Sequence, residues 1–345
     1  MKLHRLLGGR RRLTDFLDRF AAKHLSEVLS SVGRPPAATI EAFTSGRNTL
    51  VRRLNLADGS SLVLRGYFVD PVKQKGYTHW YLNRRLAERG FHVPAILFRR
   101  VFAFPRGKAN VEVLIEEFVE GQAIGEAMRE DESVRRRLAE TLVRLHSDRS
   151  PQPGRPPHGG LSGQVPTDPL RAAVERVPLL LDRIRLQLSE VTAQQAQRCL
   201  RWFRDSIGRR PVCETYELVH GDFSRDNLLL APGGEIALID LGTMAYSHFE
   251  VDLAAARWGF FDQAWWEQFC EDYFAIDPSG RKRFEQSGPL FSALYCLQKA
   301  SSRAVRARKA AEKGDHAATE SYRTESRRFW SLLLSTLSAD SAARF

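Results

Sequence analysis

Apolar residues are arranged differently in the first third of the chain and in the remainder. Between residues 41 and 120 they form short runs typical of strands, at 50–56, 61–68, 95–104 and 111–121. The tripeptide Ala-Asp-Gly at 57–59 predicts a hairpin turn between the first two runs. Residues 79–90 have helical character and end at a glycine, which commonly closes a helix. The pattern predicts a small antiparallel sheet with one helix.

Beyond Gly121 helical periodicity dominates. The segment 133–146 places leucines on one face. Residues 150–169 contain six Pro and four Gly, which predicts a long loop. Residues 216–241 interrupt the helical part with apolar, strand-like runs. The fold class is therefore expected to be α+β, with a sheet-rich first part and a larger helical second part.

The first 24 residues form a candidate basic helix. They carry seven Lys and Arg, and their apolar residues fall on one helical face: Leu13, Phe16, Leu17 and Phe20. Such a helix can be a peripheral anchor on an anionic membrane face. Alternatively, it packs its apolar face onto the domain and leaves its charges in water. The short length and interrupting glycines favour the second interpretation.

The charge of the chain restricts its partners. Among 345 residues, 52 Lys and Arg against 41 Asp and Glu give a net charge of +11. This favours nucleotides, phosphorylated glycans or acidic lipid surfaces and disfavours a polycationic substrate. No RNA- or DNA-binding motif occurs, so no specific nucleic acid is expected. The four isolated cysteines predict reduced thiols in a cytoplasmic protein. No apolar run approaches the roughly 20 residues that a membrane helix needs.

The segment 216–241 carries the candidate chemistry. One apolar run ends in the His-Gly-Asp tripeptide that closes with Asp222, a polar stretch leads to Asn227, and a later apolar run ends in Asp240. Phosphoryl transfer depends on positioning the acceptor hydroxyl and neutralising phosphate charge. Asp222 suits a proton acceptor, and Asn227 and Asp240 offer the oxygen ligands that Mg²⁺ prefers. Each residue alone could be an ordinary turn or cap residue, but the combination favours chemistry.

These residues resemble the motifs of the aminoglycoside and choline phosphotransferases, which share the protein-kinase-like fold. The HGDxxxxN motif is matched over 220–227, the following ID by Ile239 and Asp240, and the later DLA by 252–254. The resemblance extends over about residues 40 to 270 as one order of motifs. It implies a basic helical extension, a nucleotide-binding N-lobe and a helical C-lobe, over residues 1–39, 40–120 and 121–345.

The resemblance also implies roles for these residues. Asp222 would be the catalytic base, Asn227 and Asp240 would bind Mg²⁺, and ATP would be the phosphoryl donor. His220 and Asp252 would brace the catalytic loop rather than contact substrate.

Further candidate nucleotide contacts follow from the same resemblance. The backbone C=O of Glu117 and N–H of Val119 would hold the adenine edge, and Ser45 and Gly46 lie where a phosphate-covering loop is expected. Arg225 either supplies charge to the γ-phosphate or is a solvated loop residue.

Two positions depart from the family pattern. Arg65 occupies the strand position of the usual phosphate-binding Lys, and about His79 stands where its partner Glu is expected. The segment around Arg65 resembles bacterial lipopolysaccharide core sugar kinases, in particular the Kdo kinases, which would make the chain an active kinase. The alternative is a pseudokinase that binds nucleotide or a partner without turnover. The presence of Asp222, Asn227 and Asp240 together favours activity.

Charge also bears on the acceptor. The last third of the chain carries a basic series in place of the acidic walls that would attract an aminoglycoside: Lys299, Arg303, Arg306, Arg308, Lys309 and Lys313. We therefore expect an anionic small molecule or glycolipid as acceptor, such as an envelope sugar. Peripheral contact with the inner face of the cytoplasmic membrane would suit such an acceptor.

Overall fold

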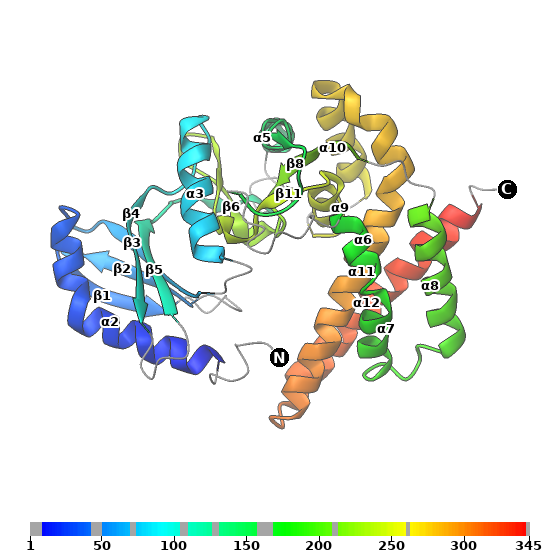
Figure 1. Cartoon of the computed structure of the whole chain (residues 1–345), viewed down its shortest axis with the longest axis horizontal. Helices are drawn as coiled ribbons and strands as arrows, with labels where there is room; N and C mark the ends of the chain where they lie inside the picture. The colour runs from blue at the N-terminus through cyan, green and yellow to red at the C-terminus, as the bar shows by residue number, and fades with distance from the viewer. Residues whose placement is uncertain are drawn as a thin grey trace. The chain divides into compact units, whose positions relative to one another are not determined.

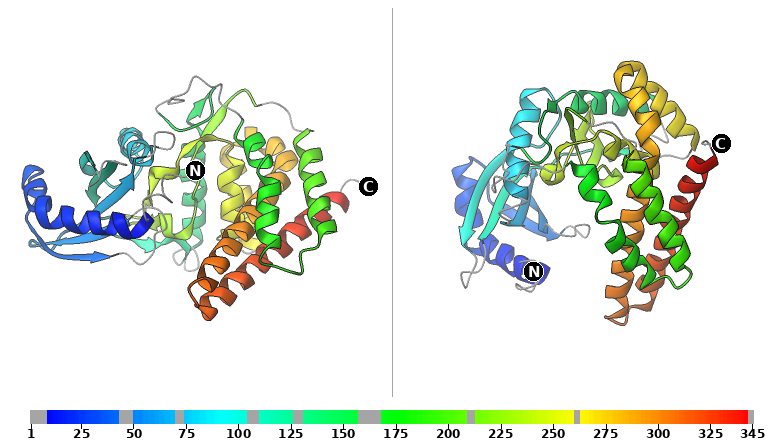
Figure 2. Two further views of the ribbon diagram at one scale, coloured as in Figure 1. Left: turned by 60° about the horizontal axis from the view of Figure 1, so that its bottom comes forward. Right: turned by 45° about the vertical axis from the view of Figure 1, so that its right-hand side comes forward.

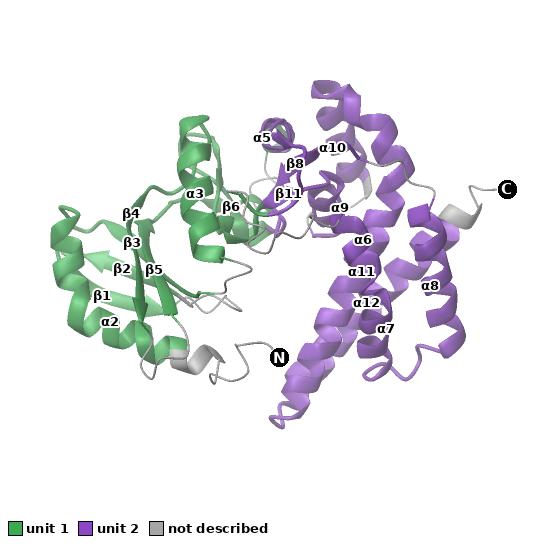
Figure 3. Ribbon diagram, in the orientation of Figure 1, with its two compact units in different colours: residues 1–134, 155–163, 225–244 green, residues 135–154, 164–224, 245–345 purple. Residues whose placement is uncertain are grey.

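The computed structural model describes residues 9–42, 50–69, 74–103, 110–125, 131–156, 168–208, 213–259 and 263–342. The chain forms two compact units, coloured separately in Figure 3. Unit 1 comprises residues 1–134, 155–163 and 225–244, and unit 2 comprises 135–154, 164–224 and 245–345. The chain passes from unit 2 to unit 1 between Ser224 and Arg225, inside the segment with the candidate chemistry. The functional boundaries expected at 39/40 and 120/121 stay a prediction.

Unit 1 is built on a five-stranded antiparallel sheet in the order β1-β2-β3-β5-β4 (Figure 1). Its strands are β1 (Ala37–Ala42), β2 (Leu50–Leu56), β3 (Ser61–Phe68), β4 (Ile96–Ala103) and β5 (Asn110–Glu117). Its two long helices are α2 (Gly9–Ser31) and α3 (Lys75–Glu88). The two runs predicted at 50–56 and 61–68 are confirmed as paired strands. The run predicted at 111–121 is a strand only to Glu117.

Alternation along β3 and β5 gives this sheet two different faces. Leu62 and Leu64 of β3, with Val113 and Ile115 of β5, join one apolar cluster with α2. The intervening residues of both strands point to the opposite face, where α3 packs. That face contains buried charges, which the candidate site uses.

Helix α2 uses its apolar residues to cover the sheet. Leu13, Leu17 and Phe20 are at most 2% exposed and belong to the same cluster as the sheet leucines. A Cβ atom at Gly66 of β3 would lie only 3.0 Å from Leu17 Cδ2, so a glycine allows this close approach. The packing interpretation of the N-terminal helix is confirmed for these side chains.

The strands of 216–241 belong to two different small sheets. In unit 1, β10 (Ile236–Leu238), β9 (Leu228–Leu230) and β6 (Gln122–Ala123) pair in that order. In unit 2, β8 (Tyr216–Val219) pairs between β11 (Ala245–Ser247) and β7 (Arg149–Ser150). The strand-like runs predicted within 216–241 are confirmed as strands, but they lie in two different sheets, because β8 pairs with β7 and β11 whereas β9 pairs with β10 and β6.

The rest of unit 2 is helical. Its helices are α5 (Glu132–His146, beginning in unit 1), α6 (Pro169–Val174), α7 (Val177–Arg185), α8 (Ala193–Gly208), α9 (Glu250–Gly259), α10 (Gln263–Ile276), α11 (Arg281–Ala311) and α12 (His316–Ala342). Figure 2 shows α11 and α12, orange and red, side by side as a hairpin. Their apolar sides join α7 and α8 in one core. Among the described residues, no helix has the length and apolar character needed to cross a membrane.

Candidate active site

The α3-facing side of the β3–β5 pair carries a buried ionic contact. Arg65 of β3 pairs in register with Leu114 of β5, and Glu116 lies two residues further along the same face. Arg65 Nε donates a hydrogen bond to Glu116 Oε1, and the two side chains are 8% and 1% exposed. His79 Nε2 of α3 lies 2.9 Å from Glu116 Oε2, although outside hydrogen-bond alignment. The carboxylate of Glu116 therefore joins a strand arginine to a helix histidine.

The charges of this contact stabilise one another. Burial alone would raise the pKa of Glu116, but the adjacent Arg65 and His79 lower it to about 2. Burial alone would lower the pKa of Arg65, and Glu116 raises it above its ordinary value. Tyr67 OH lies 3.1 Å from His79 Nδ1 and extends the chain of contacts. The Arg65–Glu116 pair is therefore fully ionised at neutral pH.

The two predicted metal ligands lie next to each other in unit 1. The backbone N–H of Ile239 donates to the Asn227 carbonyl at 3.0 Å, so Asn227 adjoins the residue before Asp240. Asp240 has a left-handed backbone with φ of 56°, which aspartate tolerates better than most residues. Its Oδ1 lies 3.8 Å from Arg65 Nη1. The candidate phosphate contact Arg65 and the two metal-ligand candidates are thus grouped at one place.

This donor set fits Mg²⁺. In the part of the chain that the structure describes, no group of three or more His, Cys, Asp or Glu side chains forms a metal site. Mg²⁺ commonly takes one or two protein carboxylates and completes its shell with phosphate and water oxygens. The carboxylate of Asp240 and the amide oxygen of Asn227 suffice for that mode.

In unit 2, the loop before Asp222 is held through its backbone. Asp252 of α9 accepts hydrogen bonds from the N–H groups of His220 at 2.6 Å and Gly221 at 2.9 Å. Gly221 has a φ of 74°, where a side chain would be strained. His146 Nε2 lies 3.3 Å from the same Asp252 carboxylate, which is fully buried. The predicted bracing of the loop by Asp252 is confirmed.

Helix α11 contributes to the electrostatic surroundings of Asp222. Tyr295 and Lys299, one helical turn apart, both interact electrostatically with Asp222. Lys299 Nζ lies 5.0 Å from the centroid of the Tyr295 ring. Burial lowers the pKa of Lys299, an effect that the Asp222 carboxylate opposes. Among the described residues, no carboxylate forms an ion pair with Lys299.

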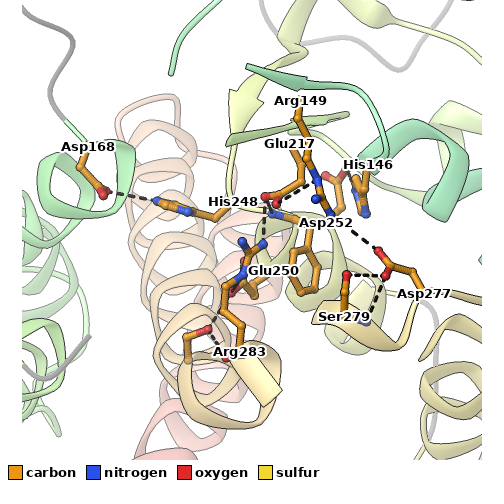
Figure 4. A network of polar contacts seen from close by, with 12 residues as sticks. His146, Arg149, Asp168, Glu217, His248, Glu250, Asp252, Asp277, Ser279 and Arg283 are labelled. Carbon is orange, nitrogen blue, oxygen red and sulfur yellow. Dashed lines mark hydrogen bonds and ion pairs between the residues drawn. The ribbon is translucent and has the colours of Figure 1, made fainter. Parts of the chain in front are cut away.

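A polar network adjoins the Asp252 brace (Figure 4). Arg283 of α11 lies 2.9 Å from Glu217 and 3.2 Å from Glu250, and Arg149 lies 3.8 Å from Asp277. Members of this network line a cavity of about 230 Å³. Through Arg283, this network connects α11 to β8 and α9.

The predicted adenine contacts lie directly after β5. The Glu117 carboxylate pairs with Arg34 Nη2 at 3.3 Å, so its side chain is engaged away from any base. Val119 follows in an irregular segment, and its N–H has no hydrogen bond among the described residues. The backbone of Val119 is available for a ligand.

The other predicted contacts have different outcomes. Arg225 belongs to unit 1 and packs over Gly125, where a Cβ atom would lie 2.7 Å from Arg225 Cδ. Ser45 and Gly46 lie outside the described residues.

Sequence reasoning missed Glu116 and Tyr295. The signal for Glu116 was its alternation with apolar residues along β5, which assigns it to the face of Arg65 once the strands are paired. The signal for Tyr295 was its i, i+4 spacing to Lys299.

The chain matches a protein-family model and resembles several solved structures. Residues 39–284 match the model of the phosphotransferase enzyme family. A thermostable aminoglycoside phosphotransferase APH(4)-Ia has a TM-score of 0.60 and 14% identity, covering 88% of this chain and 97% of its own. A candidate fructosamine-3-kinase from Haemophilus somnus 129PT has a TM-score of 0.58 and 13% identity, covering 88% and 96%.

APH(2'')-IIa, solved in a ternary complex with streptomycin and ATP, has a TM-score of 0.55 and 14% identity, covering 81% and 89%. These likenesses confirm the expected α+β, protein-kinase-like fold. No curated protein sequence matches the chain significantly.

Proposed function

Because the chain belongs to the phosphotransferase enzyme family, we propose that it is a Mg²⁺- and ATP-dependent kinase acting on the hydroxyl group of an anionic sugar or glycolipid. The observation that carries this proposal is the 3.8 Å approach of Arg65 to Asp240, beside Asn227. This arrangement supplies a cation for phosphate and oxygen ligands for a metal. Solved members of the fold carry ADP or AMP-PNP with hygromycin B, which supports a nucleotide donor.

Each residue has a defined role in the proposed reaction. Asp222 accepts the proton of the acceptor hydroxyl as the oxygen bonds to the γ-phosphorus, and the bond from that phosphorus to the β–γ bridging oxygen breaks to release ADP. Arg65 contacts the nucleotide phosphates, and Arg225 offers further positive charge. Asn227 and Asp240 hold Mg²⁺, which neutralises phosphate charge when bound.

The remaining nucleotide contacts follow the sequence prediction. The backbone C=O of Glu117 and N–H of Val119 bind the adenine edge, which the unbonded Val119 N–H supports. Ser45 and Gly46 would belong to the loop that covers the nucleotide phosphates.

The anionic acceptor is supported by Lys299. Its ammonium group is half-buried, interacts electrostatically with Asp222 and has no ion-pair partner among the described residues. A partly desolvated cation favours a ligand that brings negative charge. A polycationic aminoglycoside would instead meet repulsion from Lys299. The acceptor class is therefore one with a carboxylate or phosphate close to the reacting hydroxyl, such as an acidic envelope sugar.

The test is calorimetric titration with ATP, with and without Mg²⁺, followed by slow ATP hydrolysis in the same sample. We expect magnesium-dependent binding in the wild type and in Asp222→Asn, with hydrolysis lost in the variant, since the substitution removes a proton acceptor and no metal ligand. Hydrolysis that persists in Asp222→Asn would disprove the assigned base. Binding without turnover in the wild type would favour the pseudokinase alternative, and absence of binding would refute a nucleotide site.

A further inference from the structure

Arg65 has two edges that contact different groups. Its Nε bonds to Glu116, whereas its Nη1 faces Asp240 at 3.8 Å. A guanidinium group is a rigid planar fork, so fixing one edge also fixes the direction of the other. A lysine has a single charged nitrogen and cannot separate the two contacts in this way. The bond to Glu116 therefore determines the direction of the other edge of Arg65, which faces Asp240.

The carboxylate that holds Arg65 lies on strand β5, and helix α3 supplies the side chain that contacts this carboxylate. The family resemblance leads us to expect a carboxylate on the helix at about position 79, but this position is His79. The carboxylate is on β5 instead, and His79 Nε2 contacts its second oxygen at 2.9 Å. A glutamate at 79 would bring two buried carboxylates together, which is unfavourable. A histidine at 79 therefore fits beside the Glu116 carboxylate, whereas a glutamate there would not.

All three groups are excluded from water. Arg65 and Glu116 have side chains 8% and 1% exposed, and His79 is fully buried. Removing one member of a buried ion pair leaves an uncompensated charge, so such a contact responds strongly to substitution. Surface pairs show no comparable response.

We propose that Glu116 is the positioning residue of the nucleotide site: it holds Arg65 so that the edge of the guanidinium group facing Asp240 meets the phosphates, and His79 fixes Glu116 from helix α3. This inference rests on the proposed function, because it assumes that Arg65 contacts nucleotide. In this arrangement Glu116 acts through Arg65, and His79 connects helix α3 to nucleotide binding.

The test is the MgATP affinity and steady-state kinetics of Glu116→Gln, which keeps the side-chain shape and removes the charge. We expect a loss in MgATP affinity and a rise in the KM for ATP of about 10-fold, with a smaller change in kcat, because phosphate binding is disturbed while Asp222 is untouched. Glu116→Asp should recover part of the affinity.

Glu112→Gln is the matched control. Glu112 is a second buried glutamate on the same face of β5, but it pairs with Arg99 at 2.6 Å. Both variants lose a buried carboxylate, and thermal unfolding measures the common structural cost. Only Glu116→Gln should change MgATP affinity. Unchanged affinity in Glu116→Gln, or an equal loss in Glu112→Gln, would overturn the proposal.

A relocated carboxylate provides a second test, which compares a double variant with its two single variants. The double variant Glu116→Gln/His79→Glu moves the negative charge from β5 to α3. We expect it to bind MgATP more tightly than the sum of the two single losses predicts, because the charge again faces Arg65. Strictly additive losses would contradict the proposal. Wild-type protein that binds no MgATP would instead refute the proposed function, so the two failures are distinguishable.

Discussion

The two regions that carry the candidate residues are held by different kinds of contact. On the β3–β5 face of unit 1, Arg65 and Glu116 contact each other through their side chains. In unit 2, the loop before Asp222 is held by two backbone N–H groups that donate to Asp252. The first arrangement departs from the expected family pattern, and the second matches it residue by residue.

The difference shows which kind of contact can be supplied by residues of another element. A strand offers every second residue to the same face, so a charge lost from a neighbouring helix can be replaced from the adjacent strand. A loop held through its backbone needs a glycine at positive φ and one carboxylate in reach of both N–H groups, which Gly221 and Asp252 provide. A substitution at either position removes one of these conditions.

The largest expected effect comes from breaking the backbone-held region. Asp252→Asn would replace a carboxylate that accepts from His220 and Gly221 by an amide with only one accepting oxygen. Displacing the loop should lower kcat by about 100-fold, since small misplacements of a catalytic group carry costs of that order. MgATP affinity, measured by calorimetry, should stay close to that of the wild type. A variant with normal kcat would show that the loop does not depend on Asp252.

The same contrast explains what the sequence could predict. The loop residues were predicted because a linear motif specifies them, and both β2 and β3 were predicted because their apolar runs end at turn residues. Glu116 was missed because its partner is set by strand register, which involves residues 51 positions apart. The division of β8 and β9 between two sheets could not be predicted for the same reason, because an apolar run predicts a strand but not its neighbour.

A smaller effect should follow from changing the side-chain-held region. Arg65→Lys keeps the charge but loses the fork that bonds Glu116 with one edge and faces Asp240 with the other. We expect the KM for ATP to rise by about 10-fold with a smaller change in kcat. Steady-state kinetics with varied ATP would measure this. An Arg65→Lys enzyme with unchanged KM would mean that a point charge suffices and that the two-edged geometry is not required.

A third variant tests how residues of unit 2 select the acceptor. Lys299→Gln removes the half-buried cation near Asp222, and Lys309→Gln removes an exposed lysine of the same helix as a control. We expect Lys299→Gln to reduce the preference for an acidic over a neutral sugar by about 5-fold, as expected for one partly solvated charge contact. ADP formation with glucuronic acid and with glucose would measure the preference. Equal behaviour of the two variants would remove the support for an anionic acceptor.

The last expected effect, which sharpens the comparison between the two regions, concerns acid stability. The pKa of Glu116 is about 2 in the folded protein, because Arg65 and His79 outweigh the effect of burial, against an ordinary value of 4.5. A carboxyl group with a lowered pKa contributes stability that is fully present above pH 4.5 and is lost as the pH falls toward 2. The difference in free energy of unfolding between wild type and Glu116→Gln should therefore shrink over this range.

Urea unfolding at pH 6, 5, 4 and 3 would measure that difference. Asp168 in unit 2 offers a parallel: burial would raise its pKa, but His248 at 3.2 Å and two backbone N–H groups lower it to about 2. Asp168→Asn should show the same direction of change with a smaller amplitude, because Asp168 is more exposed than Glu116 and its contacts are better screened by water. A difference between wild type and Glu116→Gln that stays constant with pH would show that ionisation of Glu116 does not contribute to stability, and that the Arg65–Glu116 ion pair does not stabilise unit 1.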